Sequence, residues 1–435
     1  MNSKISFFWF RRDLRIEDNA ALFHALKNNA PLQALFIFDT TILNQLESGE
    51  DARVTFIYQN LEKLHYQLKN HGSSLLILQG NPLSIWKELV SNHSIEAVYA
   101  NRDYEPYART RDKEVYYLLK EAGIPFITKK DHVIFEKNEI VKKDGSPYVV
   151  YTPYSKVWKA KLNDFYTKPY ASETINHWHP SDYSFPSIES IGFKKSTIII
   201  PPHQIPTSII KNYHATRDIP SKAGTSRLGI HLRFGTISCR SLVQIAQSFN
   251  EKYLNELIWR DFYSAILWHF PHVVKTPFHK KYTLLEWRNN EEEFKRWCTG
   301  ETGYPIVDAA MRELNTTGYM HNRVRMVVAS FLTKHLLINW QWGEAYFASK
   351  LLDFDLASNN GGWQWSASTG VDAAPYFRIF NPTAQAKKFD PDNEYIQKWI
   401  PEIDTPKYPY PLVDHSFARN RALAAYKEAL SKTPL

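Results

Sequence analysis

Cysteine is nearly absent from this sequence: 435 residues include only Cys239 and Cys298. Two cysteines without a CxxC pair are too few for a disulfide framework, and neither has metal-ligand spacing around it, so we expect no metal site. No apolar stretch approaches the roughly 18 residues that a membrane-spanning helix needs. The apolar run 5–10 ends at once in Arg11, Arg12 and Asp13, which is not how a signal peptide continues. These absences predict a monomeric cytoplasmic protein with no membrane span.

Long runs of like charge are also missing, so there is no basic or acidic tail. The basic excess is spread along the chain instead, with a net charge of +8 and a pI near 9.1. Aromatic residues are abundant at 14% of the sequence, and large flat rings can stack on bases and planar cofactors as well as fill a core. A distributed positive charge together with many aromatic rings favours nucleic acid as the partner.

The first 135 residues contain no GxG pair, so the glycine fingerprint of dinucleotide-binding sheets is absent. The region nevertheless alternates short apolar runs with amphipathic stretches, which predicts a Rossmann-like α/β domain with a parallel sheet. The predicted strands are 5–10, 34–38, 75–78, 97–99 and 125–127, and the predicted helices are 19–27, 53–69, 83–90 and 110–121.

The remaining chain separates into a connector and a helical part. Residues 136–205 show no clear period, and we interpret them as a long interdomain connector in which 198–200 forms one short strand or anchor. Residues 206–435 show helical spacing throughout and predict an all-α domain. Its predicted helices are 242–249, 254–270, 291–297, 306–314, 322–340 and 344–352.

Two segments of the helical part combine polar chemistry with helix-start or helix-face positions. Residues 224–229, GTSRLG, offer N–H and O–H donors to a phosphate group, or simply begin a capped helix. In the predicted helix 254–270, Glu256, Trp259, Arg260 and Tyr263 share one face. That face suits a base-binding pocket, and the alternative is an ordinary Glu–Arg pair with aromatic packing.

Two further segments carry clustered polar side chains. In residues 318–326, GYMHNRVRM, Asn322 can cap the following helix, and two arginines near that start are placed for anionic groups. Residues 353–365, DFDLASNNGGWQW, resemble a calcium loop only superficially, because Ala357, Ser358 and Gln364 stand where ligands and a glycine are required. We interpret this segment as a polar loop that hydrogen-bonds a planar heterocycle opposite stacking indoles.

Three runs then carry a resemblance that spans nearly the whole chain. They are 359–382 (NNGGWQWSASTGVDAAPYFRIFNP), 303–312 (GYPIVDAAMR) and 8–15 (FWFRRDLR). Together they resemble the photolyase and cryptochrome family, and they are most similar to its microbial, class I, cyclobutane-dimer enzymes. The resemblance implies that the all-α domain binds FAD and that the partner is ultraviolet-damaged DNA, repaired by blue or near-ultraviolet light.

The resemblance also implies a role for each matching residue. The residues implied to hold FAD are Tyr213, Thr225, Ser226, Arg227, Leu228, Arg325, Asp353, Asp355 and Asn359. Those implied to bind the flipped dimer or DNA phosphates are Arg217, Glu256, Trp259, Arg260, Asn322, Arg323, Met326 and Trp365. Trp363, Trp340 and Trp287 match the family's chain of electron-carrying indoles, and Glu256 and Asn359 match residues that act in repair.

Individual residues distinguish subtypes within the family. Asn322 stands near the position where (6-4) photolyases have a histidine pair, and both Trp259 and Trp365 are present where DASH cryptochromes tend to replace one indole. Asn359 stands where plant cryptochromes carry Asp. These residues favour the repair enzyme, and the alternative is a cryptochrome-type flavin photoreceptor without repair activity.

A second, light-harvesting chromophore is the least determined feature. Family members often hold a methenyltetrahydrofolate or a deazaflavin as antenna. Glu105 and Lys275 match positions that contact folate in some members, whereas Val274 departs from the cysteine found beside that lysine. The resemblance therefore leaves the identity of the antenna open.

Overall fold

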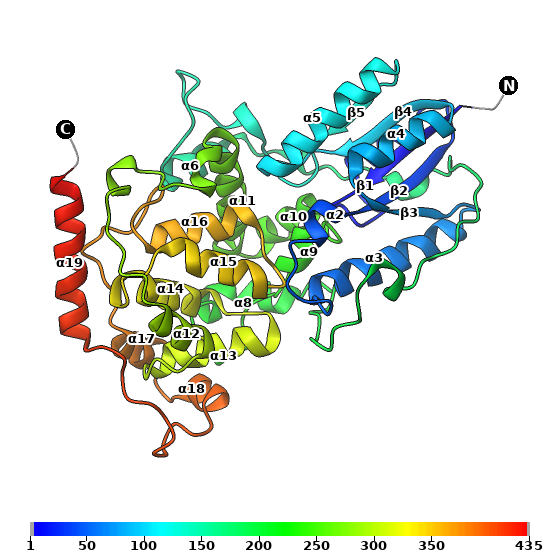
Figure 1. The fold of residues 1–435 in the computed structure, drawn as a ribbon. Coiled ribbons are helices and arrows are strands. Elements are labelled where there is room, and N and C mark those ends of the chain that lie inside the picture. Colours follow the sequence, from blue (N-terminus) through cyan, green and yellow to red (C-terminus); the bar gives the residue numbers. More distant parts are fainter. Residues whose placement is uncertain (1–3, 433–435) are drawn as a thin grey trace. The chain divides into compact units, whose positions relative to one another are not determined.

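The chain forms two compact units, in a computed structural model that describes residues 4–432 (Figure 1). The first unit comprises Met1–Glu139, Trp158–Gln204 and Leu228–Ser248, and the second comprises Ile140–Val157, Ile205–Arg227 and Phe249–Leu435. The chain thus passes between the units several times, and residues 136–205 are shared by both. The predicted domain boundaries 1–135, 136–205 and 206–435 stay a prediction.

The first unit is built on a five-stranded sheet whose neighbouring strands are all parallel, in the order β3-β2-β1-β4-β5. The strands are β1 (Ile5–Phe10), β2 (Leu32–Asp39), β3 (Leu75–Gly80), β4 (Ile95–Asn101) and β5 (Phe126–Lys129). All five predicted strands are present, and the predicted α/β fold class is confirmed.

Apolar side chains on both faces of the central strands explain why this sheet forms. Every residue of β1 and β2 is buried, as expected for parallel strands covered on both sides. Phe8 and Phe10 contribute to one core cluster, whereas Phe7 and Trp9 contribute to the other. A continuous apolar run such as 5–10 therefore supplies both faces of the sheet at once.

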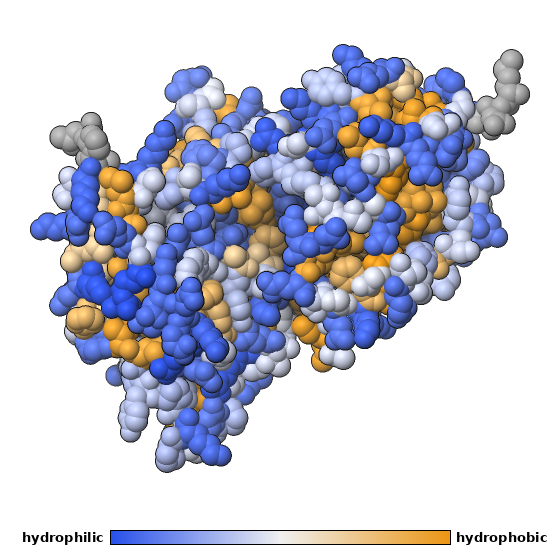
Figure 2. All heavy atoms as spheres, viewed as in Figure 1, coloured by the Kyte–Doolittle hydropathy of each residue, from blue (hydrophilic) through white to orange (hydrophobic). Residues whose placement is uncertain are grey.

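Helices cover the two faces of the sheet. The helices that contribute core residues to one face are α1 (Ala20–Leu26) and α3 (Ala52–Lys69), and those on the other are α4 (Pro82–Asn92) and α5 (Pro106–Glu121). In Figure 2, hydrophobic side chains reach the surface over α4 and the adjoining part of the sheet. Further helical segments are α2 (Thr40–Leu43), η1 (Lys137–Glu139), α7 (Asp164–Thr167), η2 (Ser172–Thr174), η3 (Glu189–Ile191), α9 (Gly229–Arg233) and α10 (Cys239–Phe249).

The second unit is helical, and its described residues contain no strand, so the predicted all-α character is confirmed. Its helices up to α14 are α8 (Thr207–Thr216), α11 (Glu251–His269), η4 (Pro271–Val274), η5 (Lys280–Tyr282), α12 (Glu291–Thr299), α13 (Pro305–Thr317) and α14 (Asn322–Ser330). The rest are η6 (Phe331–His335), α15 (Trp340–Lys350), α16 (Leu356–Ser366), α17 (Pro382–Phe389), α18 (Glu394–Trp399) and α19 (His415–Ser431). Within residues 4–432, no helix is both long and apolar enough to cross a bilayer.

The predicted connector is more ordered than its sequence suggests. It contains α6 (Tyr151–Lys161), which the aperiodic interpretation missed and whose first part belongs to the second unit. Tyr154 and Trp158 of this helix are buried, but polar residues such as Thr152 and Lys156 alternate with them and obscure the helical period. The predicted strand at 198–200 is wrong, because Ile199 is 90% exposed and no strand forms there.

The predicted continuous helix over 322–340 is also wrong. The α-helix ends at Ser330, a π-helical turn follows over Phe331–His335, and Leu337 adopts a positive φ of 51°. A new helix then starts at Trp340 with Asn339 as its N-cap. Apolar residues continue through the break because Leu336, Leu337 and Ile338 are themselves buried, so hydrophobic spacing alone concealed it.

Two local predictions around the polar segments need correction. The segment 353–365 is not a loop: Asp355 accepts a hydrogen bond from the backbone N–H of Ser358, and α16 begins at Leu356. Asn322 is not the cap of its helix, because the side chain of His321 accepts the hydrogen bond from the backbone N–H of Arg323. The adjacent glycines of α16 are typical of a loop and so led to the wrong prediction. In α14, His321 caps the helix in place of the expected Asn322.

Candidate active site

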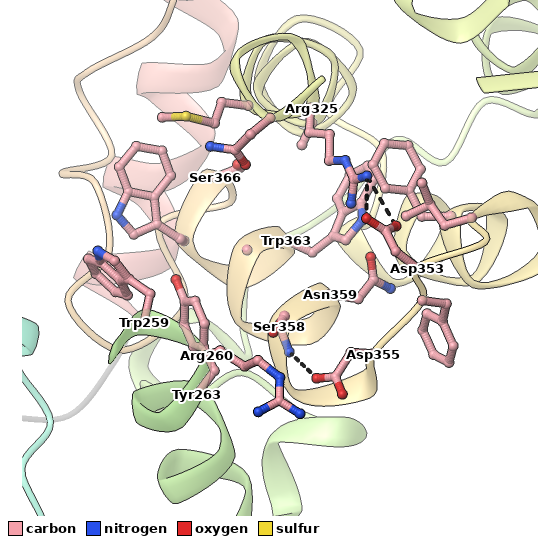
Figure 3. A pocket seen from close by; sticks show the side chains of 18 of the residues that line it. Trp259, Arg260, Tyr263, Arg325, Asp353, Asp355, Ser358, Asn359, Trp363 and Ser366 are labelled. Carbon is pink, nitrogen blue, oxygen red and sulfur yellow. Dashed lines mark hydrogen bonds and ion pairs between the residues drawn. The ribbon is translucent and has the colours of Figure 1, made fainter. Parts of the chain in front are cut away.

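A cavity of about 410 Å³ lies inside the second unit and gathers most of the residues singled out in the sequence (Figure 3). It is lined by side chains of α11, α14, α15 and α16 and of the turn that leads into α16. The predicted residues that line it are Arg217, Glu256, Trp259, Arg260, Asn322, Arg325, Met326, Asp353, Asp355, Asn359, Trp363 and Trp365. The structure thus brings together residues that lie up to about a third of the chain apart, and their individual roles stay predictions.

Helix α11 presents one polar and aromatic face to this cavity. Asn250 caps the helix, and Glu256, Trp259, Arg260 and Tyr263 all line the cavity, as their spacing on one helix face requires. The opposite side of α11 supplies core residues, including Ile258 and Phe262, which are fully buried. The helix is therefore fixed by its apolar side and presents its polar and aromatic side to the cavity.

Helix α16 supplies another part of the lining and places Asn359 beside the cavity (Figure 3). The Asn359 amide nitrogen donates to the backbone oxygen of Glu344 at 3.1 Å and to its Oε1 at 2.9 Å. Burial raises the pKa of the Glu344 carboxyl, and the hydrogen bond from Asn359 opposes this shift. The amide orientation of Asn359 is thus held by a carboxyl group from α15.

An ion pair between Arg325 and Asp353 spans part of the cavity wall. Arg325 Nη2 donates to both carboxylate oxygens of Asp353, at 3.1 and 3.0 Å, and Arg325 Nε donates to the backbone oxygen of Met320 at 2.7 Å. Figure 3 shows this pair on the same side of the cavity as Asn359 and Trp363. The guanidinium of Arg325 and the carboxylate of Asp353 give this wall both hydrogen-bond donors and hydrogen-bond acceptors.

The rim beside α11 alternates acidic and basic side chains. Arg217 Nη1 donates to Glu256 Oε1 at 2.5 Å, and Arg323 Nη2 donates to Asp218 Oδ1 at 2.6 Å. Burial raises the pKa of the Glu256 carboxyl, while the Arg217 guanidinium opposes the shift. Carboxylates thus hold both arginines at the rim.

Hydroxyl groups cluster around the segment 224–229. Thr225 Oγ1 lies 2.9 Å from the hydroxyl of Tyr319, and Ser226 Oγ lies 2.9 Å from that of Tyr253. Arg227 has a positive φ of 53° and places its guanidinium 4.4 Å from the centre of the Tyr319 ring. None of these residues lines the 410 Å³ cavity, but Arg325, which does, lies 5.8 Å from the same ring.

Tyr213 and Leu228 are the other two members of the implied FAD-binding set, and neither lines the cavity. Tyr213 is buried on α8, and its ring meets Tyr253 edge-on with centroids 5.1 Å apart, so it belongs to the same hydroxyl cluster. Leu228 is buried in the first unit, whereas the other residues of this set are in the second. The structure therefore assembles all but one of them within one compact unit.

The three implied electron-carrying indoles belong to the core of the second unit. Trp363 and Trp340 are each 2% exposed and share one core cluster, against which the partly buried Trp287 packs. Trp363 alone of the three lines the cavity, and its ring lies 6.0 Å from that of Trp297, a neighbour that the sequence did not single out. Trp363 thus lies at the cavity wall, and Trp287 is partly exposed.

The two proposed antenna contacts lie in different units. Glu105 is in the first unit, where Arg12 Nη1 and Arg233 Nη1 donate to its Oε1 at 2.9 and 2.5 Å. Lys275 follows η4 in the second unit. A chromophore that uses Glu105 would have to share this carboxylate with two guanidinium groups, and both assignments stay predictions.

Several residues of the site escaped sequence reasoning. Tyr151 lies parallel to Trp259, Glu344 holds Asn359, and Tyr253 and Tyr319 hold the 224–229 segment. Tyr151 and Glu344 are distant in sequence from the residues that they contact, so no local pattern connects them. Among the described residues, no group of three or more His, Cys, Asp or Glu side chains could hold a metal ion.

Comparison with known families assigns both parts of the chain. Residues 6–173 match the family described as DNA photolyase, and residues 253–406 match the FAD binding domain of DNA photolyase. A deoxyribodipyrimidine photo-lyase of Synechococcus sp. is 37% identical over 97% of this chain and 96% of its own length. The protein of the same name from Escherichia coli is 36% identical over 97% of this chain and 98% of its own length.

Solved structures agree with these sequence matches. A bacterial class III photolyase from Agrobacterium tumefaciens superposes with a TM-score of 0.86 at 31% identity, covering 100% of this chain and 99% of the other. An archaeal photolyase from Sulfolobus tokodaii, solved with two FAD molecules, gives 0.85 at 34% identity over 97% of this chain and 99% of the other. A Synechocystis cryptochrome with 24% identity shares the fold. The chain belongs to the DNA photolyase family.

Proposed function

We propose that this chain is a deoxyribodipyrimidine photo-lyase, which uses light to split cyclobutane pyrimidine dimers in DNA. The observation that carries the proposal is the cavity, whose lining includes Glu256, Trp259, Asn322, Met326 and Trp365 together with Asn359 and Trp363. The photo-lyase name of relatives at full-length coverage supports the same activity. We further propose that the chain acts as a monomer in the cytoplasm, where it meets DNA.

The cavity fits the flat, partly polar ring system of FAD. Gly362 lines it, and a Cβ at this glycine would meet no atom within 4 Å, so open space faces that position. The indole N–H of Trp363 is buried, and it has no hydrogen-bond partner among the described residues. Phe347, Leu351 and Phe354 supply apolar wall, so the site combines apolar packing with a few directed polar groups.

We infer that Arg325, Asp353, Asp355 and Asn359 hold the ring systems of FAD, and that Tyr213, Thr225, Ser226, Arg227 and Leu228 hold its phosphates and their surroundings. The hydroxyl and guanidinium groups around 224–229 are donors that suit a diphosphate. Bound FAD supplies the light absorption and the electron that breaks the cyclobutane bonds. The protein supplies placement, hydrogen bonds and exclusion of water.

The basic residues of the rim serve DNA binding in this proposal. Arg217, Arg260 and Arg323 contact phosphates, while the dimer leaves the stack and enters the cavity. Extrusion costs a few kcal/mol, least where a damaged site is already poorly paired. Stacking is worth about 1–3 kcal/mol per base, so Trp259 and Trp365 can offset most of that cost. Glu256 then hydrogen-bonds the pyrimidine edge, and its raised pKa favours the proton needed for donation.

The indoles of Trp363, Trp340 and Trp287 have a separate task in this proposal. They carry electrons that keep FAD in the reduced state needed for repair, and they do not touch the dimer. The partly buried position of Trp287 supports its place as the outer member of the chain. A second chromophore that feeds light to FAD is consistent with the Sulfolobus relative, and its identity in this chain is left open.

The experiment that tests the proposal mixes the FAD-loaded, chemically reduced protein with an oligonucleotide containing thymine dimers. Splitting a dimer restores the ultraviolet absorbance of two thymine rings, so absorbance should rise in blue light and stay constant in the dark. A flavin photoreceptor would keep the light response of FAD without this rise. If the ultraviolet absorbance does not rise in blue light although the protein retains FAD, the result favours a flavin photoreceptor.

A further inference from the structure

The indole of Trp259 is covered on one side by the ring of Tyr151. The two rings are parallel within 2°, and their centroids are 3.7 Å apart. Tyr376 and Tyr426 are equally parallel, but their centroids are 5.8 Å apart, so that pair is offset. Tyr151 and Trp259 therefore overlap almost completely, face to face, at van der Waals contact.

Tyr151 is itself held from several directions within the second unit. Its hydroxyl donates to the backbone oxygen of Asn255 at 3.0 Å, and its backbone N–H donates to Asp372 Oδ2 at 3.1 Å. Phe262 meets the rings of both Tyr151 and Trp259 edge-on, with centroids 6.0 and 5.6 Å away. Burial and the nearby Glu256 charge raise the pKa of the Tyr151 phenol, so it stays a neutral donor.

Tyr151 contacts Trp259 outside the cavity. Trp259 lines the cavity and Tyr151 does not, so the phenol covers indole surface that a ligand in the cavity does not use. Part of the remaining indole surface lines the cavity, with Trp365 also on its wall. A flat base that stacked on the cavity side of Trp259 would form a stack of three rings, with Trp259 between the base and Tyr151.

Fixing a side chain before binding removes an entropic cost from the binding step. Ordering one rotamer-rich side chain on binding weakens affinity by about 2- to 10-fold, whereas a side chain that is already ordered carries no such cost. Trp259 lies between Phe262, Tyr263 and Tyr151, and of these Tyr151 alone lies parallel against its face. The ring of Tyr151 therefore has the greatest influence on the plane in which Trp259 presents itself.

We propose that Tyr151 is a positioning residue that holds Trp259 as a preformed stacking surface and so increases the preference of the protein for extruded pyrimidines. The inference rests on the proposed function, because it assigns Trp259 to the dimer pocket. Tyr151 acts in recognition of the lesion. Other residues determine the yield of bond splitting once the dimer is bound.

The test compares three variants of the full, FAD-loaded chain. Tyr151→Leu removes the ring, Tyr151→Phe keeps the ring and removes the hydroxyl, and Tyr154→Leu is the matched control on the same helix. Tyr154 is buried and packs against Phe262 at 5.1 Å, and no ring contact joins it to Trp259 among the described residues. Dissociation constants are measured for duplexes with and without one thymine dimer, together with repair per absorbed photon at saturating DNA.

Only the ratio of the affinities for damaged and undamaged DNA should change. Tyr151→Leu should lower the preference for damaged over undamaged DNA by about 2- to 10-fold. Its affinity for undamaged DNA and its repair per photon at saturation should stay unchanged. Tyr151→Phe and Tyr154→Leu should keep the wild-type preference. Where Tyr151→Leu does not fold, Tyr151→Met replaces it and should give the same loss.

Three outcomes would overturn the inference. An unchanged preference in Tyr151→Leu would show that Trp259 needs no support from the ring. An equal loss in Tyr154→Leu would assign the effect to packing of α6, and an equal loss in Tyr151→Phe would assign it to the hydroxyl. If the wild-type protein neither prefers nor repairs dimers, the proposed function itself fails and the inference falls with it.

Discussion

The ring of Tyr263 lies directly against Gly361, so that a Cβ added to this glycine would come within 2.2 Å of the tyrosine Cδ1. The next residue is the opposite case, because a Cβ at Gly362 would meet no atom within 4 Å and Gly362 lines the cavity. Two adjacent glycines of α16 thus have different reasons to be glycine: one admits an aromatic ring, and the other keeps space in the cavity.

Alanine at these two positions should therefore act differently. Gly361→Ala should destabilise the protein by about 1–3 kcal/mol, because Tyr263 must move in a packed core. Gly362→Ala should leave the FAD-free protein as stable or up to about 1 kcal/mol more stable, because alanine favours a helix. It should nevertheless weaken FAD binding. Thermal unfolding of the FAD-free protein and FAD titration measure the two effects, and equal FAD affinity in Gly362→Ala would show that FAD lies elsewhere.

Repair should depend on pH through Glu256. Burial raises the pKa of this carboxyl, and Arg217 opposes the shift, so release of Arg217 to a DNA phosphate would raise the pKa further. A raised pKa means that the proton is lost as pH rises through it, and a carboxylate cannot donate a hydrogen bond. Repair per photon should therefore fall as pH rises through the range in which this raised pKa lies.

The matched variant for this prediction is Glu256→Gln, whose amide donates at every pH. Its repair per photon should be independent of pH over the same range. Parallel pH profiles for the wild-type protein and Glu256→Gln would assign the dependence to another group.

Arg323 should contribute to DNA affinity without regard to damage. It is held by Asp218 at the rim and lies 4.2 Å from the centre of the Phe389 ring. Arg323→Glu should weaken binding to damaged and undamaged duplexes alike and reduce the slope of log affinity against log salt by about 0.9 for each phosphate that is no longer neutralised. Lys295→Glu, at an exposed position of α12, changes the net charge equally and is the control. Equal effects of the two variants would remove Arg323 from the DNA surface.

Trp363 should matter for light-driven reduction of FAD and not for repair by protein that is already reduced. Trp363→Phe should slow photoreduction at least about tenfold, because a phenyl ring is far harder to oxidise than an indole. Trp297→Phe is the control, since Trp297 is equally buried and its ring lies 6.0 Å away. If chemically reduced Trp363→Phe fails to repair dimers, Trp363 has a structural role and the electron-chain assignment is wrong.

Local sequence patterns predicted those features that depend only on neighbouring residues within one helix or strand. The central strands β1 and β2 followed from continuous apolar runs, because parallel strands buried on both faces are rich in apolar residues. The shared face of Glu256, Trp259, Arg260 and Tyr263 followed from helical spacing alone. In each case the pattern lies within one element, so the neighbouring residues are enough to read it.

Features that depend on contacts between distant segments could not be predicted in this way. The glycines of α16 suggested a loop, but they are explained by the ring of Tyr263 from α11 and by the cavity. The break after Ser330 lies within buried apolar residues, and the hydrophobic period continues across it. The support of Asn359 by Glu344 and of Trp259 by Tyr151 exists only in three dimensions.

Photo-lyase activity is tested by counting the thymine dimers repaired per protein molecule during alternating light and dark periods. A duplex with one thymine dimer is supplied in excess over the FAD-loaded, chemically reduced chain, and its products are separated and quantified. We predict that each molecule repairs many dimers under blue light, that repair stops in each dark period, and that undamaged duplex is unchanged. A chain that holds FAD and binds the damaged duplex but repairs none in the light would contradict the account.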